Sequence, residues 1–325
     1  MTPDGVARRV AQKETRLFFA SPVAWLFLAS FAALSLFVFF WVESFFARNI
    51  ADIRPLFEWM PVLLIFLCSA LTMRMWSEER RTGTLEHVMT QPVALWRFVL
   101  GKFRACFSLL LLALAATLPL PVTVELIADL DWGPVIAGYV ATALLGAAYL
   151  SAGLSISALT DNPIVSLIGS VALCGVLYLV GSGTITDFFD NQAGETLRLL
   201  GSGSRFESIS RGVVDVRDLF YYVSVTIGFL TINVYLLEKE RWARAVSTVR
   251  HRNWRAATVL VLVNLLLANV WLHRVGGLRI DVTEGRLYSI SGPTMEFIEH
   301  LEEPLLLRGY FSAKTHPLLA PLVPQ

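Results

Sequence analysis

The chain has 325 residues, of which 55% are hydrophobic and only 16% are charged, and its formal net charge is +1. Soluble domains of this size carry roughly a quarter charged residues, and here the missing charge leaves long uncharged runs. The composition therefore excludes an ordinary soluble domain and indicates an integral membrane protein with several spans. The balanced charge also gives no basis for binding nucleic acid.

The cysteines and histidines show no pattern of a chemical site. Cys68, Cys106 and Cys174 all lie within apolar runs, where a role as small hydrophobic residues is favoured over disulfide or metal chemistry. The histidines are scattered without the spacing of metal ligands. We therefore predict no catalytic residue, no metal ion and no cofactor in this chain.

The first element is an amphipathic helix over residues 6–19. Its basic residues alternate with apolar ones at helical spacing, and they are Arg8, Arg9, Lys13 and Arg16. Such a helix lies in the membrane interface with its basic face toward anionic headgroups. We expect it on the cytoplasmic side.

Uncharged runs then predict seven membrane spans, at residues 23–42, 59–73, 105–124, 132–160, 162–186, 219–237 and 256–272. A helix of about 20 residues crosses the hydrocarbon layer, so the second run is short and must borrow flanking residues. The fourth and fifth runs are separated by a tight turn, in which Asn162 caps a new helix and Pro163 takes its first position.

The distribution of Lys and Arg gives the orientation. With the N-terminus inside, the short inner loops are rich in Lys and Arg, as cytoplasmic loops usually are. Most of the Lys and Arg residues on the outside lie in the two longest segments, where this preference is weak. The sequence predicts a cytoplasmic N-terminus and an extracytoplasmic C-terminus.

A short charged segment, residues 78–92, lies between the second and third runs. Thr84 can cap a helix with Glu86 in its first turn, and Gln91-Pro92 can end it. Leu85, Val88 and Met89 share one face at helical spacing. The pattern predicts a small amphipathic helix at the membrane surface with an apolar edge for a partner. The alternative is a charged loop that only fixes the topology.

An outer segment, residues 187–218, precedes the sixth run. Phe206, Ile209 and Val213 fall on one face at helical spacing, which favours an interfacial helix that covers the outer end of the bundle. The alternative is a solvated connector. Asn233, Asn264 and Asn269 lie in the sixth and seventh runs, where they can bond across helices or line a pathway.

After a basic cytoplasmic linker, residues 238–255, and the seventh span, the tail has a soluble character. Residues 279–283 alternate as a strand does, a helix begins at a Ser291 cap, and residues 305–312 predict a second strand. Only about fifty residues follow the last span, which are too few for a full core. We therefore expect the chain to be a fragment of a longer protein.

Five stretches resemble known proteins. Residues 13–25 and 78–92 are similar to the opening and the cytoplasmic coupling segment of type-2 ABC transporter permeases, especially the gliding-motility-associated branch, although Thr15 replaces a usually apolar residue. Residues 205–218 resemble the element before the last span of these permeases. Residues 281–291 and 301–312 resemble the opening of the auxiliary protein that is paired with them.

The resemblance implies an all-α polytopic membrane protein. Residues 1–240 would form a six-helix ABC type-2 permease bundle with an N-terminal interfacial helix. Residues 241–274 would form a cytoplasmic linker and a seventh transmembrane helix, and residues 275–325 the start of an α/β extracytoplasmic auxiliary domain.

The expected function is the permease subunit of an ATP-dependent exporter in a bacterial inner membrane. The chain has no phosphate-binding loop, because the pair Gly101-Lys102 lacks a glycine five positions upstream. ATP and magnesium would therefore bind to a separate dimeric ABC ATPase, and a second permease copy would complete the complex. The predicted ATPase-coupling residues are Glu79, Arg80, Arg81, Thr82, Gly83, Thr84, Leu85, Glu86 and Val88.

Each group of coupling residues has an expected role. The charged residues would make charge-assisted contacts, Gly83 would permit a tight turn, and Leu85 with Val88 would fill a groove on the ATPase. A second hypothesis is a non-transporting scaffold that passes motion to extracytoplasmic partners. A third, an intramembrane hydrolase using residues 201–204, lacks a histidine in any predicted span to act as base. The transported substrate stays open among lipid, polysaccharide, peptide and drug.

Overall fold

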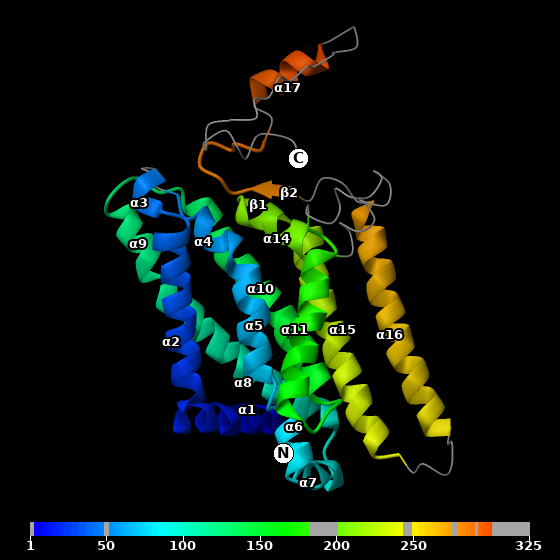
Figure 1. The fold of residues 1–325 in the computed structure, drawn as a ribbon. Coiled ribbons are helices and arrows are strands. Elements are labelled where there is room, and N and C mark those ends of the chain that lie inside the picture. Colours follow the sequence, from blue (N-terminus) through cyan, green and yellow to red (C-terminus); the bar gives the residue numbers. More distant parts are fainter. Residues whose placement is uncertain are drawn as a thin grey trace.

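The computed structural model describes residues 3–48, 52–182, 201–242, 249–274, 279–289 and 292–300. Long helices run side by side between two ends of the molecule (Figure 1). They are α2 (Pro22–Phe37, extended by a π-helical turn, Val38–Val42), α5 (Met60–Thr72), α8 (Leu95–Thr117), α10 (Trp132–Ser157), α11 (Pro163–Leu179), α15 (Val216–Glu240) and α16 (Val249–His273).

Short elements occupy the two ends (Figure 1). One end, the α6–α7 end, holds α1 (Pro3–Ala20), α6 (Ser77–Arg81) and α7 (Leu85–Thr90). The other, the β1–β2 end, holds α3 (Phe45–Arg48), α4 (Arg54–Glu58), α9 (Pro119–Glu125), α14 (Gly203–Ser210), β1 (Val213–Asp215), β2 (Arg279–Asp281) and α17 (Gly292–Glu299).

The predicted membrane bundle is confirmed. Within the described residues, six helical stretches are long and apolar enough to cross a membrane, and α11 is a shorter apolar helix. The fifth predicted span, residues 162–186, continues past residue 182 and so partly outside the described residues. Its predicted start is confirmed, because Asn162 Oδ1 accepts a hydrogen bond from the backbone amide of Ile164 at 2.9 Å.

The third span begins ten residues earlier than predicted. The sequence placed its start at residue 105, because charged residues precede that point, but α8 begins at Leu95. Its first turns therefore carry Arg97, Lys102 and Arg104 on the helix. Lys102 is buried, and the helix accommodates it because its charge is paired within the protein, as described below.

Helix α1 confirms the predicted N-terminal helix and lies across the lower ends of the long helices (Figure 1). It crosses α8 at Gly101, where an added Cβ would lie 2.7 Å from the Cβ of Val10 and 2.9 Å from the carbonyl oxygen of Ala7. A glycine is therefore required at this crossing for the two backbones to approach so closely.

The outer segment is partly as predicted. Phe206 and Ile209 are buried, so the solvated-connector alternative is wrong for these residues. Val213 is also buried but lies on β1 and not on the helix, because α14 ends at Ser210 and Gly212 turns the chain at φ +92°.

The tail strand joins this outer segment. The predicted strand at residues 279–283 is confirmed over Arg279–Asp281, and it pairs antiparallel with β1. The amide of Glu284 donates to Asp131 Oδ2 at 3.0 Å, which fastens the tail to the start of α10. The Ser291 cap and the second predicted strand lie outside the described residues, and the division at residues 240 and 274 stays a prediction.

The three asparagines predicted to lie within spans differ in their hydrogen bonds. Asn269 bonds across helices, because its Nδ2 donates to Ser224 Oγ of α15 at 2.8 Å. Asn264 instead donates to the carbonyl of Leu260 on its own helix. The buried amide of Asn233 has no hydrogen-bond partner among the described residues.

The crossing of α1 over α8 can be tested with Gly101→Ala. The added methyl group overlaps backbone and side-chain atoms of α1, so we expect a loss of about 1–3 kcal/mol in the free energy of unfolding, measured by titration with a denaturing detergent. Gly175→Ala is the matched control, since no atom lies within 4 Å of its added Cβ. Equal stability of the two variants would contradict the close crossing.

Candidate coupling site

The segment from α6 to α7 follows α5 at the end where α1 lies (Figure 1). Ser157, in the last turn of α10, fixes its start: its Oγ accepts hydrogen bonds from the amides of Trp76 at 3.0 Å and Ser77 at 3.2 Å. Gly83 makes the reversal between the two helices at φ +74°, in open space. The predicted turn at Gly83 is thus confirmed, and Gln91, in extended conformation before Pro92, ends α7 as predicted.

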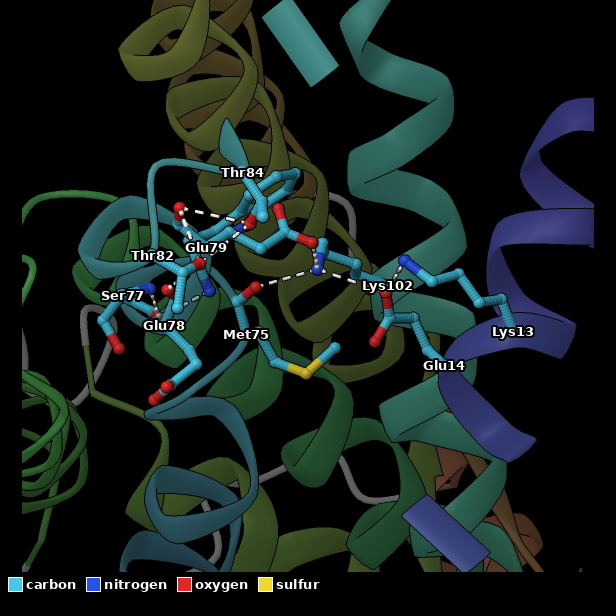
Figure 2. A network of polar contacts seen from close by, with 11 residues as sticks. Lys13, Glu14, Met75, Ser77, Glu78, Glu79, Thr82, Thr84 and Lys102 are labelled. Carbon is cyan, nitrogen blue, oxygen red and sulfur yellow. Dashed lines mark hydrogen bonds and ion pairs between the residues drawn. The ribbon is translucent and has the colours of Figure 1, made fainter. Parts of the chain in front are cut away.

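A buried ion network anchors this segment to α1 and α8 (Figure 2). The Nζ of Lys102 lies 2.8 Å from Glu79 Oε1 and 3.3 Å from Glu14 Oε1, and it donates to the carbonyl of Met75 at 2.8 Å. It also stands 4.7 Å from the ring centre of Trp76. The Lys102 side chain is only 4% exposed, so this ammonium group depends on its carboxylates for stability.

Arg80 joins α6 to two further spans. Its guanidinium donates to the carbonyl of Ala158, after the last turn of α10, at 2.6 Å, and to Glu240 Oε1, at the end of α15, at 3.3 Å. Glu79 and Arg80 therefore face the bundle. They were predicted to contact an ATPase directly, but their charged groups are engaged inside the protein.

Arg241 holds the end of α7. It donates to the carbonyls of Met89 at 2.8 Å and Gln91 at 3.0 Å, which are groups that a helix end leaves without intrahelical partners. The buried carboxylate of Glu238 lies 3.5 Å from Arg241. Through Lys102, Ser157, Arg80 and Arg241, the α6–α7 segment is thus connected to α1, α8, α10 and α15.

The apolar edge of α7 packs inward. Leu85 is 8% exposed and belongs to the core of the protein, and Val88 and Met89 pack partly buried against the same core. The Leu85 side chain is therefore engaged within this chain, and its predicted contact with a groove on a partner stays a prediction. Its helical spacing correctly identified a buried face, but the face is covered by this chain.

Thr84 occupies the predicted position before the first residue of α7 but does not cap it. Its backbone is helical and its side chain accepts no capping bond from the backbone. Its hydroxyl lies 3.0 Å from the hydroxyl of Thr82 and 3.4 Å from the carbonyl of Glu79. The two threonines instead brace the turn around Gly83.

Five of the nine predicted coupling residues lie exposed on one surface, which we name the exposed coupling surface: Arg81, Thr82, Gly83, Thr84 and Glu86. Arg81 pairs with Glu78 at 2.6 Å, yet its side chain is 61% exposed. Surface ion pairs of this kind contribute little stability. Both charges are therefore accessible to a partner.

The prediction missed Glu14, Lys102, Ser157 and Arg241. A signal for Lys102 was present, since a lysine one or two turns inside an apolar helix marks a site by default. The others carry no local signal, because their partners lie far away in sequence.

The structure gives no support to the hydrolase hypothesis. The buried hydroxyl of Ser202 lies 3.2 Å from the carbonyl of Leu177 and donates a hydrogen bond to it.

Comparison with known proteins agrees with this geometry. The family model described as "ABC-2 family transporter protein" matches residues 57–198, which include α5 to α11. The match supports a type-2 ABC permease, that is, a multi-pass membrane component of an ABC transporter. A comparison with curated proteins gave no match. In the described part of the chain, no group of His, Cys, Asp and Glu side chains could hold a metal ion.

The role of Lys102 can be tested by Lys102→Met. The substitution leaves Glu14 and Glu79 as buried, unpaired carboxylates, so we expect a loss of about 3 kcal/mol or more in the free energy of unfolding. Arg104→Met is the control, because Arg104 is exposed on the same helix. Adding Glu14→Gln and Glu79→Gln to Lys102→Met should restore most of the lost stability. A triple variant as unstable as Lys102→Met would show that the ion network is not the cause.

Proposed function

We propose that this chain is the membrane-spanning permease subunit of an ATP-dependent ABC exporter, and that a separate ABC ATPase drives it. One observation carries the proposal: the exposed coupling surface is small and polar, and the segment that bears it is fastened to α1, α8, α10 and α15. A surface loop that only fixed topology would need none of these connections.

The proposed mechanism is mechanical. An ATPase that binds the exposed coupling surface pushes α6 and α7 as a unit, because the buried ion pairs resist their separation from the spans. The spans then rock between inward-open and outward-open states as rigid bodies. ATP and magnesium bind to the ATPase, and a second copy of this chain pairs with the first, as the resemblance to type-2 permeases implies.

The same proposal fixes the orientation. The α6–α7 end faces the cytoplasm, where ATP is available, and the β1–β2 end faces the extracytoplasmic side of a bacterial inner membrane. The basic residues of α1 and the linker after α15 favour this orientation. Helix α1 and the exposed coupling surface lie at the same end of the molecule, which agrees with this orientation.

A second candidate, a non-transporting subunit that passes motion to extracytoplasmic partners, has support from the tail. Because β2 pairs with β1, the tail is fastened to the residues directly before α15. The resemblance to the gliding-motility-associated branch and its auxiliary protein agrees with this arrangement. ATP-dependent transport by the complex in proteoliposomes would favour the exporter, and its absence with intact ATPase coupling would favour this candidate.

The orientation can be tested by cysteine labelling. Thr82→Cys should react with a membrane-impermeant maleimide in inside-out vesicles and not in spheroplasts, and Glu284→Cys at the other end should show the reverse. The background is low, since Cys68, Cys106 and Cys174 are all buried. Labelling of Thr82→Cys from the outside of spheroplasts would refute the transporter proposal.

The coupling surface can be tested by the double reversal Arg81→Glu with Glu86→Lys. Both side chains are exposed, so membrane insertion and stability should be unchanged, whereas affinity for the co-purifying ABC ATPase should fall by about tenfold, as unfavourable charge contacts at an interface cost 1 kcal/mol or more. Arg9→Glu, exposed on α1 at the same end, is the control. Unchanged ATPase binding and unchanged transport would refute the assignment.

A further inference from the structure

A groove opens on the side of the bundle between α11, α15 and α16. Its volume is about 670 Å³, and its walls are mainly aliphatic, with Val176, Phe229 and Leu266 contributed by the three helices. Helix α16 lies at the edge of the molecule (Figure 1), and only 6% of its apolar stretch is buried. The groove therefore faces the lipid and not water.

The depth of the groove fits one leaflet of a bilayer. Along α15 it extends from Tyr221 to Ile232, which corresponds to roughly 17 Å at the helical rise of about 1.5 Å per residue. Half of the hydrocarbon layer is about 15 Å thick. A single acyl chain that is anchored at the membrane surface would span this depth.

The groove continues into a polar cavity at the β1–β2 end. This second cavity has a volume of about 300 Å³ and shares Arg205 and His273 with the groove. Its lining also includes Asp215, Asp218, Arg217 and Arg279. An apolar channel that opens into a charged cavity suits an amphipathic ligand with a charged head.

The charges in the polar cavity favour an anion. Arg205 pairs with Asp218 at 2.7 Å, and Arg217 Nε donates to Asp215 Oδ2 at 2.7 Å. Burial would raise the pKa of Asp215, but the hydrogen bonds and charge of Arg217 hold it below its ordinary value, so this pair is ionised. Both carboxylates are thus engaged. Arg279 is the strand partner of Asp215, and its charge also lowers the pKa of that carboxyl, but among the described residues it forms no ion pair within 4.0 Å. Arg274 adds a further cation at the end of the groove.

We propose that this groove and cavity form a binding site for a phospholipid, with one acyl chain between α15 and α16 and the phosphate beside Arg279 and Arg274. The bound lipid fills the groove that α16 forms with α15 and α11. Asn269, bonded to Ser224, sets the width of this groove at its polar half. This site goes beyond the permease proposal and does not rest on it.

The site can be tested by native mass spectrometry of the purified full chain, with added phosphatidylglycerol or with diacylglycerol of the same chain lengths. Leu266→Trp fills the groove, and Leu267→Trp is its matched control, since the two leucines are 59% and 60% exposed but only Leu266 lines the groove. We expect Leu266→Trp to reduce the bound fraction of phosphatidylglycerol by about tenfold, and Leu267→Trp to leave it unchanged.

A second pair of variants tests the headgroup. Arg279→Gln removes a cation from the polar cavity. We expect it to weaken the binding of phosphatidylglycerol about tenfold, as the loss of a charge-assisted hydrogen bond predicts, and to leave the binding of diacylglycerol unchanged. Arg54→Gln, a cation on α4 at the same end but outside both cavities, should change neither. The proposal would be overturned if Arg279→Gln bound phosphatidylglycerol and diacylglycerol as well as the unchanged protein does. It would also be overturned if Leu266→Trp and Leu267→Trp changed lipid binding equally. Loss of a dimer by Leu266→Trp with unchanged lipid binding would assign the groove to a second copy instead.

Discussion

The buried ammonium group of Lys102 is the constraint on which the α6–α7 end depends. A charge removed from water costs several kcal/mol unless it is paired with good geometry. Its partners come from two separate parts of the chain: Glu14 on α1, and the carbonyl of Met75 with Glu79 in the segment that leads from α5 into α6. Loss of either part would leave the buried charge with fewer partners. The interfacial helix, the turn after α5 and the start of α8 therefore hold one arrangement together, and the ion network links a surface helix to the membrane spans.

The same constraint divides the charges of α6. Read along the sequence, the four consecutive residues from Glu78 to Arg81 look equally available. The helix turns Glu79 and Arg80 toward the bundle, and it places Glu78 and Arg81, three positions apart, on the outer side. The outer pair is therefore the more accessible part of α6. In the proposed mechanism the outer pair would receive the force and the inner pair would pass it to the spans.

The sequence predicted correctly those features that depend on residues close together in the chain. The Asn162 cap, the end of α7 at Gln91-Pro92 and the buried face of Phe206 and Ile209 all follow from neighbours within one helical turn. The sequence could not indicate the partner of Lys102, since that requires knowing that α1 crosses α8 at Gly101. It could not place Val213 on a strand either, because its partner β2 follows two further spans, α15 and α16. The apolar edge of α7 shows the same limit, because periodicity identifies a buried face but not what covers it.

Helix α15 connects the two ends of the molecule. At the α6–α7 end, Glu240 bonds Arg80, and Arg241, directly after the helix, holds the last carbonyls of α7. At the β1–β2 end, the helix begins directly after β1 and carries Asp218, which pairs with Arg205 of α14. Because α15 is a continuous helix, we expect a displacement of its end beside α6 and α7 to move its other end as well. The groove is lined by the same helix, so in the proposed mechanism a movement driven through α6 and α7 would also change the width of that groove.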